Sequence, residues 1–217
     1  MIKAVIYDLD GVIVNTAKYH YLAWKNLANS LGFDFSEEQN EQLKGVSRAK
    51  SLEIILNWGG ITLNQNQKEK LLIQKNKEYL AYINTLSSKD ILPGISDTLA
   101  YLKLSDKKIA LGSASKNAVP ILEKLDIINL FDVIVDGNQV SLAKPNPEVF
   151  LKAANKLNLN PSQCVVIEDA KVGIEAALNA QMTCVGIGDK THLYKANYVL
   201  EDTSKLSHDF LKVLLKN

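Results

Sequence analysis

The chain has 217 residues, which is long for one compact domain and short for two, so we expect one core domain that carries an insertion. With 47% hydrophobic and 23% charged residues, the composition excludes a collagen-like or largely disordered chain. The 25 basic and 24 acidic residues leave a formal charge of +1, so no overall field favours a nucleic acid or an anionic membrane as a partner.

The first predicted element is a short buried strand. Residues 2–7 form an apolar, largely β-branched run that stops at Asp8 and Asp10. The sequence shows no signal-peptide pattern and no apolar run long enough to span a membrane. We therefore expect a cytoplasmic location.

The next segment, residues 16–86, has helical patterns only. Ser36 and Gln39 fit a capping box that opens one helix, Asn64 can cap the next, and Gly32 is a suitable stop for the helix that begins near Thr16. A helical block that interrupts an α/β chain directly after its first strand predicts an inserted cap domain. We leave Trp58 in the core of this domain.

Strands and helices alternate in the rest of the chain. The predicted strands are residues 108–111, 133–135, 164–167 and 183–186, and the predicted helices are residues 96–104, 118–125, 147–157 and 172–180. This alternation predicts an α/β, Rossmann-like parallel sheet with helices on both faces, built from residues 1–15 and 87–217. Cys164 and Cys184 lie in apolar runs, so we expect buried free thiols rather than a disulfide framework.

Chemically active residues follow the carboxyl ends of the predicted strands, where the ligands of open parallel sheets bind. This set comprises Asp8, Asp10, Ser113, Ser115, Lys144, Glu168 and Asp169. Carboxylates gathered at one edge repel one another unless a cation neutralises them, and Mg²⁺ prefers oxygen ligands. Hydroxyls, a lysine and a cation together predict a metal-assisted phosphate site.

Each of these residues also has a plainer interpretation. Asp8 and Asp10 can cap backbone amides at a strand end, and Lys144 can be a solvated loop lysine before a helix. Ser115 or Asn117 can be the N-cap of the helix that follows. It is the combination of these residues that favours the functional interpretation.

The ordered motifs resemble the haloacid dehalogenase superfamily of phosphotransferases. The resemblance rests on the run from Asp8 to Val12, then Ser113, Lys144-Pro145 and Glu168-Asp169. It extends over the whole chain, because further residues resemble the branch that interconverts β-glucose 1-phosphate and glucose 6-phosphate: Thr16, His20, Trp24, Leu43-Lys44-Gly45-Val46-Ser47-Arg48 and Ser113-Ala114-Ser115-Lys116-Asn117.

The resemblance implies roles for the core residues. Asp8 is expected to be the nucleophile that becomes an aspartyl phosphate, and Asp10 the general acid and base. Mg²⁺ is expected on Asp8, on the backbone carbonyl of Asp10 and on Asp169, with Glu168 close by. Ser113 and Lys144 are expected to hold the transferring phosphate.

The resemblance also assigns cap residues, which have plainer interpretations too. Arg48 is expected to bind the non-transferring phosphate, helped by Ser115, Lys116 and Asn117, although Arg48 and Lys44 can equally be solvated surface charges. His20, on one helical face with Thr16 and Trp24, is expected to link cap closure to Asp10, although a histidine packed on an aromatic ring is the commoner outcome.

The implied activity is a mutase reaction that passes through β-glucose 1,6-bisphosphate, in a cleft between core and cap. The alternative is a sugar-phosphate phosphatase on the same scaffold, because the same aspartyl phosphate can be hydrolysed by water. Expected partners are small sugar phosphates, with no nucleic acid or membrane, and nothing in the sequence requires more than a monomer.

Overall fold

The computed structural model, described for residues 1–216, contains a six-stranded parallel sheet with the order β3-β2-β1-β4-β5-β6. The strands are β1 (Ala4–Tyr7), β2 (Lys108–Gly112), β3 (Val133–Val135), β4 (Cys164–Glu168), β5 (Thr183–Ile187) and β6 (Tyr198–Leu200). This confirms the predicted α/β class. Strand β6 was not predicted, because three half-buried residues give too short a pattern.

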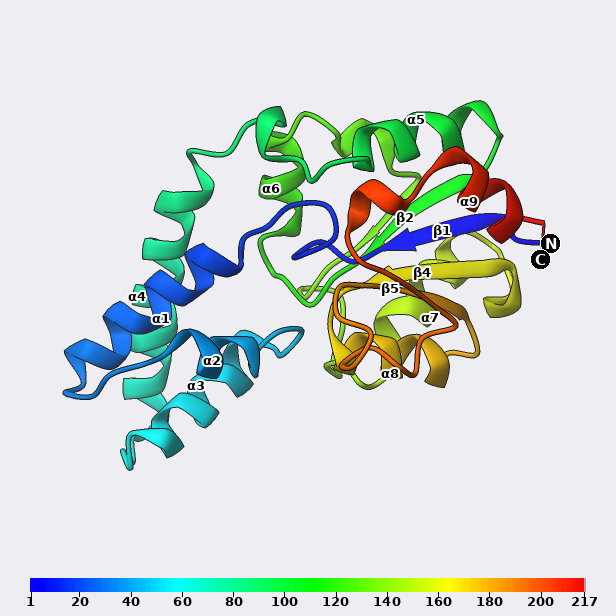
Figure 1. Ribbon diagram of the computed structural model, residues 1–217. Helices are drawn as coiled ribbons and strands as arrows, with labels where there is room; N and C mark the ends of the chain where they lie inside the picture. Colours follow the sequence, from blue (N-terminus) through cyan, green and yellow to red (C-terminus); the bar gives the residue numbers. More distant parts are fainter. Residues whose placement is uncertain (217) are drawn as a thin grey trace.

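Helices cover both faces of the sheet. They are α5 (Ile95–Leu104), α6 (Ala118–Lys124), α7 (Glu148–Lys156), α8 (Lys171–Asn179) and α9 (His208–Leu214). In Figure 1, α5, α6 and α9 lie on one face of the sheet and α7 and α8 on the other. Side chains alternate along β1, so Val5 and Tyr7 pack with the first group of helices, whereas Ala4 and Ile6 pack with the second. Cys164 and Cys184 are buried free thiols in the second layer.

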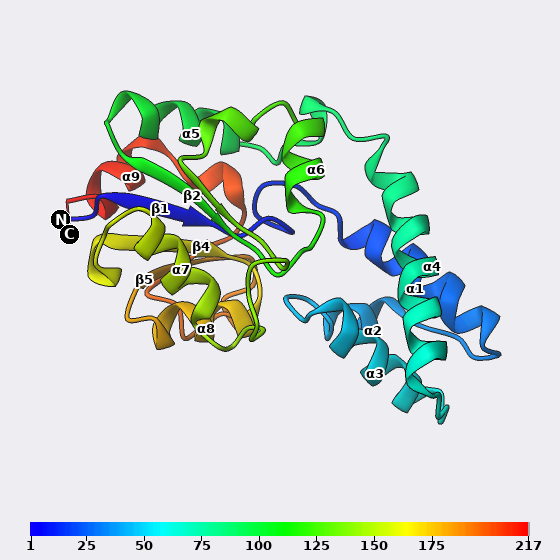
Figure 2. The same cartoon turned by 180° about the vertical axis from the view of Figure 1, so that it is seen from behind.

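Four helices lie beyond the carboxyl ends of the strands, as Figures 1 and 2 show from opposite sides. They are α1 (Ala17–Ser30), α2 (Glu37–Glu41), α3 (Arg48–Trp58) and α4 (Gln65–Ile83). The predicted capping boxes form at Ser36 and Asn64, and Gly32 takes a positive φ of 91° just after α1. No strand occurs between residues 16 and 86.

This helical segment has its own apolar cluster, centred on Trp24, Phe35 and Ile55. The placement of Trp58 in the core was wrong, because its side chain at the last residue of α3 is exposed, with its ring tilted against that of Phe35 at 6.2 Å between centroids. Four short 3₁₀ turns complete the chain: Ser88–Asp90, Ile128–Leu130, Pro161–Gln163 and Thr203–Lys205. Within residues 1–216, no helix combines the length and apolar character that crossing a membrane requires.

Candidate active site

The strand ends bring the acidic residues together. Tyr7 pairs with Leu111 of β2 on one side and with Ile167 of β4 on the other, so Asp8 emerges between the two neighbouring strands. The chain leaves this edge through Gly11, whose φ is 82°. A Cβ on Gly11 would lie 2.1 Å from an Asp169 oxygen, so only glycine lets that carboxylate approach the backbone.

Lys144 joins two of the carboxylates. Its Nζ lies 2.6 Å from Asp8 Oδ1 and 2.6 Å from Glu168 Oε1, and 1% of its side chain is exposed. The ammonium also lies 4.7 Å from the centroid of the Phe150 ring. Burial opposes the charge, but the two carboxylates outweigh it and hold the pKa of Lys144 above its usual value. Lys144 is therefore a fixed cation rather than a solvated loop residue.

The acidic cluster has an excess of negative charge that suits a divalent cation. Asp8, Glu168 and Asp169 each offer an oxygen within 4.8 Å of the others. Burial, followed by the charges of Glu168 and Asp8, raises the pKa of Asp169 well above its usual value. The nearest cation to Asp169 is Lys44, whose Nζ is 3.8 Å from Oδ2. A set of hard oxygen donors with too little positive charge fits Mg²⁺.

Hydrogen bonds already made within the site limit what each carboxylate can offer a cation. Both oxygens of Glu168 are engaged, one by Lys144 and the other by the backbone N–H of Ala170 at 2.7 Å. The side chain of Asp10 accepts a hydrogen bond from the Thr16 hydroxyl at Oδ1 and does not belong to the three-carboxylate cluster, which agrees with the backbone carbonyl as the metal ligand that the resemblance implies. Asp8 is engaged as well, at Oδ1 by Lys144 and at Oδ2 by the backbone N–H of Asp10 at 3.0 Å, whereas Asp169 lies 3.8 Å from the Lys44 ammonium. Asp169 is therefore the carboxylate of this cluster most open to a cation.

Asp10 is held where the core joins α1. Thr16 is fully buried at the N-cap position of α1, and its hydroxyl donates to the Asp10 carboxylate. Burial, and then the charge of Asp8, raise the pKa of Asp10 to about 6, and the Thr16 hydrogen bond opposes this rise. A carboxyl group with such a pKa can exchange a proton near neutral pH.

The loop that follows β2 is pre-shaped by its own hydroxyls. Ser113 Oγ accepts from the backbone N–H of Ser115 at 3.1 Å, and Ser115 Oγ accepts from that of Asn117 at 3.2 Å. Asn117 occupies the N-cap position of α6, but its side chain makes no capping bond. Its carboxamide instead donates to Asn76 on α4 at 2.9 Å. The capping interpretation therefore holds for the backbone position and not for the side chain.

A cavity of about 780 Å³ lies between the sheet edge and the helical segment. The predicted site residues that line it are Asp8, Asp10, His20, Trp24, Lys44, Gly45, Val46, Ser47, Arg48, Ser113, Ala114, Ser115, Lys116, Asn117 and Asp169. Thr16, Lys144 and Glu168 are buried and do not line the cavity. Thr16 bonds to Asp10 and Lys144 to Asp8, which do line it, and Glu168 has an oxygen within 4.8 Å of Asp8 and Asp169. The structure therefore brings every predicted site residue to one place.

The turn before α3 brings the helical segment onto the core. Gly45 has a φ of 72°, and a Cβ there would lie 2.7 Å from Val172. The neighbouring Lys44 lies near Asp169, and Arg48 opens α3 at the cavity wall. Positive side chains of the helical segment thus face the acidic edge of the sheet.

Sequence reasoning missed Lys75, which lines the same cavity. Its side chain is buried with 1% exposure, and its Nζ lies 4.7 Å from the Trp24 ring and 4.6 Å from the Tyr79 ring. Nζ is also 2.7 Å from His20 Nδ1. Burial, and then Lys75 and Arg48, hold the pKa of His20 well below its usual value, so the neutral ring can accept at Nδ1.

The sequence did contain a signal for Lys75. The buried face of α4 includes Lys75, Tyr79 and Ile83, spaced four residues apart, so the lysine stands at an apolar position of an amphipathic helix. Sequence reasoning also missed the cavity residues 201–204, because they follow the unpredicted strand β6.

Lys75 should lower the stability of the fold, since burial, aided by Arg48, reduces its pKa to about 7. Between that pH and about 10.4 the unfolded chain carries a proton that the folded chain lacks, so wild-type stability rises with pH over this window. Lys75→Met should therefore be more stable by about 1–4 kcal/mol at pH 7, with a gain that shrinks towards pH 9.5. Urea unfolding at several pH values measures this gain.

The matched control for Lys75→Met is Lys77→Met, which changes an exposed lysine of the same helix. It should change stability by less than about 0.5 kcal/mol at every pH. Equal effects of the two substitutions, or a Lys75→Met gain that grows with pH, would contradict the assignment of a strained buried cation.

Comparisons with known proteins agree with this geometry. The family of haloacid dehalogenase-like hydrolases matches residues 5–187. A β-phosphoglucomutase of Bacillus subtilis is 44% identical over 211 residues, covering 96% of this chain and 93% of that protein. A phosphorylated carbohydrates phosphatase of Thermotoga maritima is 31% identical, covering 82% of this chain and 81% of that protein.

A solved structure extends the agreement to three dimensions. The crystal structure of a β-phosphoglucomutase from Clostridium difficile superposes with a TM-score of 0.96 at 43% identity, covering 100% of this chain and 98% of that one. The similarity therefore includes the helical segment as well as the sheet. The chain belongs to the family of haloacid dehalogenase-like hydrolases.

Proposed function

We propose that this enzyme is a β-phosphoglucomutase, an isomerase that interconverts β-glucose 1-phosphate and glucose 6-phosphate through β-glucose 1,6-bisphosphate. The observation that carries the proposal is the pairing of two features in one cavity. A nucleophile site built from Asp8 and Lys144 lies at its core side, and the cations Arg48 and Lys75 lie at its helical side. Similarity to the Bacillus subtilis β-phosphoglucomutase over nearly the full length of both chains, at 44% identity, supports the same substrate.

Asp8 and Asp10 divide the chemistry. In the first half-reaction, the phosphorylated Asp8 passes its phosphoryl group to the 6-hydroxyl of β-glucose 1-phosphate while Asp10 takes the hydroxyl proton. In the second, an Asp8 carboxylate oxygen attacks the phosphorus at C1, the P–O bond to the sugar breaks, and Asp10 returns the proton to the leaving oxygen. Covalent capture on Asp8 lets one site serve both transfers.

Fixed charges supply most of the rate in such phosphoryl transfers. Lys144, Ser113 and the 113–117 loop face the transferring group, and the Lys144 ammonium pairs with the Asp8 carboxylate at 2.6 Å. Asp8 and Asp169, with the Asp10 carbonyl and the nearby Glu168, would hold Mg²⁺. When bound, Mg²⁺ supplies positive charge to the phosphoryl oxygens.

The second phosphate must be held at the opposite end of the cavity. Arg48 suits this task because its planar guanidinium can pair with two phosphate oxygens at once, and Ser115, Lys116 and Asn117 approach from the core side. Lys44 and Lys75 add charge along the path. We infer that residues 16–86 act as a cap that opens between half-reactions so that the bisphosphate can turn around.

A phosphatase is the second candidate function, because water in place of the sugar hydroxyl would hydrolyse the aspartyl phosphate. The likeness to the Thermotoga maritima phosphatase keeps this candidate open. Arg48 from the helical side, with Lys116 and Asn117 from the core side, favours the mutase, since a phosphatase has to grip only one phosphate. Cytoplasmic location and a monomeric state stay predictions.

The proposal is tested by supplying purified protein with Mg²⁺, β-glucose 1-phosphate and a trace of β-glucose 1,6-bisphosphate, and coupling product to glucose 6-phosphate dehydrogenase. Formation of the reduced nicotinamide cofactor supports the mutase. The α anomer of glucose 1-phosphate is the control substrate and should give no product. Equal rates with both anomers would contradict the proposal.

Removing divalent cations should abolish turnover and lower stability. Treatment with EDTA should reduce the coupled rate by at least about 10²-fold, because the acidic cluster then repels the phosphoryl group. Added Mg²⁺ should restore the rate and, at a concentration 100 times its Kd, raise the free energy of unfolding by about 2.7 kcal/mol. Melting curves with Mg²⁺ and with Na⁺ at equal ionic strength measure the second effect, and overlapping curves would contradict the metal assignment.

A further inference from the structure

One side-chain hydrogen bond joins the helical segment to the loop after β2. Asn117 Nδ2 donates to Asn76 Oδ1 at 2.9 Å, across the side of the cavity. Asn117 is largely buried, with 8% exposure, and stands directly before α6, whereas Asn76 projects from α4. The bond therefore links the cap helix to the loop expected to hold phosphate.

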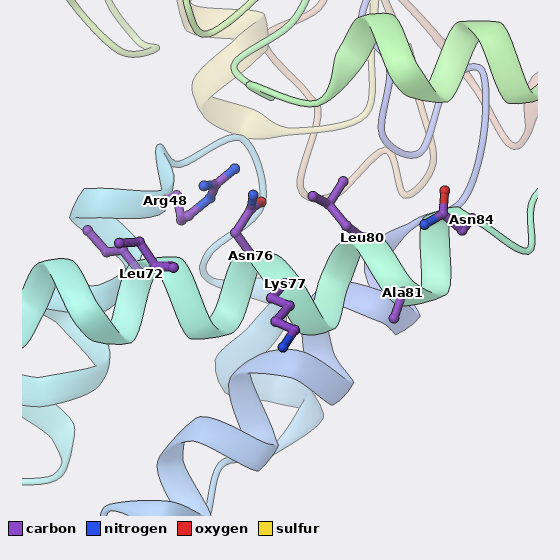
Figure 3. Close-up of a pocket in the computed structure, with 8 residues that line it drawn as sticks. Arg48, Leu72, Asn76, Lys77, Leu80, Ala81 and Asn84 are labelled. Atoms are coloured by element: carbon purple, nitrogen blue, oxygen red, sulfur yellow. The ribbon is translucent and has the colours of Figure 1, made fainter.

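Asn76 also stands beside Arg48. The two residues line a groove of about 620 Å³ along α4, and Figure 3 shows the Arg48 guanidinium and the Asn76 carboxamide on the same side of the helix. Lys77 points to the opposite side in this view. Asn76 thus adjoins Arg48 on the cap side and is bonded to Asn117 on the core side, the two residues that we expect to hold the second phosphate.

The Asn76 contact also fixes which way the Asn117 carboxamide faces. The carboxamide has two N–H donors, and one is given to Asn76. The backbone N–H of Asn117 is engaged by Ser115 Oγ, so the loop and the side chain are both held before ligand arrives. A donor that is already oriented loses less conformational entropy when it binds an anion.

We propose that Asn76 is a positioning residue for the non-transferring phosphate, which acts by orienting the Asn117 carboxamide between α4 and the 113–117 loop. The inference rests on the proposed mutase function, because only a substrate with two phosphates needs this second grip. Asn76 forms no bond to the reacting phosphorus. Its loss should therefore weaken binding of the bisphosphate and leave the chemical step largely intact.

The first variant is Asn76→Ala, which removes the acceptor while favouring the helix. The apparent KM for β-glucose 1,6-bisphosphate should rise about 3- to 10-fold, with kcat within about 2-fold of wild type. Gln74→Ala is the matched control, because it deletes an exposed carboxamide from the same helix and should leave both constants unchanged. An unchanged KM in Asn76→Ala would overturn the proposal.

A double-mutant cycle separates positioning from a general structural effect. In an Asn117→Ala background, Asn76→Ala should raise KM no further, because Asn76 acts through Asn117. If KM in the double variant instead rises by the product of the two single-variant increases, Asn76 acts independently of Asn117 and the proposal is wrong.

Asn76→Leu removes the acceptor for Asn117 but keeps a side chain of similar size, and so tests the site even where alanine is not tolerated. Its KM should rise as in Asn76→Ala, and a wild-type KM would overturn the proposal. Wild-type protein in the same assay separates the two levels of inference. Wild type that forms no glucose 6-phosphate defeats the mutase function and this inference with it, whereas active wild type with unaffected Asn76 variants defeats this inference alone.

Discussion

Asp8→Asn should lose at least about 10⁴-fold of the mutase rate, because the amide cannot attack phosphorus and no other carboxylate occupies its position between β1 and its neighbours. Asp10 is turned away to Thr16, and Glu168 is held by Lys144 and Ala170. Incubation with β-glucose 1,6-bisphosphate followed by intact-protein mass spectrometry should show a phosphorylated species in wild type and none in the variant.

The control for Asp8→Asn is Asp209→Asn, an exposed position on α9 where 94% of the side chain is accessible. It should keep the wild-type rate and the phosphorylated species. A phosphoenzyme that persists in Asp8→Asn would show that another residue is the nucleophile.

Lys144→Met should cause the largest combined loss of stability and activity. Removing the ammonium leaves Asp8 and Glu168 as uncompensated carboxylates in a site where Glu168 is fully enclosed, which should cost about 3–5 kcal/mol of unfolding free energy at neutral pH. Turnover should fall by about 10²- to 10³-fold, since the fixed cation at the transferring group is lost. Urea unfolding without added metal and the coupled assay measure the two effects.

The stability loss in Lys144→Met should depend on pH with a definite sign. Burial already raises the pKa of Glu168, and without Lys144 this rise loses its main opposition, with only the Ala170 backbone hydrogen bond still lowering the pKa. The folded variant then binds a proton more tightly than the unfolded chain does, so its stability should recover as the pH falls from 8 to 5. Lys212→Met on the exposed face of α9 is the control and should change stability by less than about 1 kcal/mol at either pH. If the stability loss of Lys144→Met grew as the pH falls, this would contradict a buried ion-pair cluster of Lys144 with Asp8 and Glu168.

The core of the fold could be predicted from the sequence because its signals are local. The first strand and the runs at 108–111 and 164–167 are short apolar segments bounded by turns, and they match β1, β2 and β4 to within one or two residues. The capping boxes at Ser36 and Asn64 were predictable for the same reason, since each needs only four residues. Strand β6 and the helix α9 were not predicted, because they are short, with three and seven residues, and β6 is only half-buried.

The residues of the candidate site likewise fall into those that local patterns predict and those that depend on tertiary packing. Residues at strand ends, such as Asp8 and Glu168, could be placed because parallel strands share one edge. Lys75 and Asn76 depend on how α4 packs against α1 and the 113–117 loop, which no local pattern encodes. Tertiary packing also decided that Asn117 bonds across the cavity instead of capping its own helix.

The central claim is that the aspartyl phosphate on Asp8 passes to a sugar hydroxyl rather than to water. Phosphorus NMR of wild-type protein with Mg²⁺, β-glucose 1-phosphate and a trace of β-glucose 1,6-bisphosphate follows both fates in one sample. The account predicts that the glucose 6-phosphate signal grows as β-glucose 1-phosphate declines, with no matching rise of inorganic phosphate. Inorganic phosphate as the main product would contradict the account and identify the enzyme as a phosphatase.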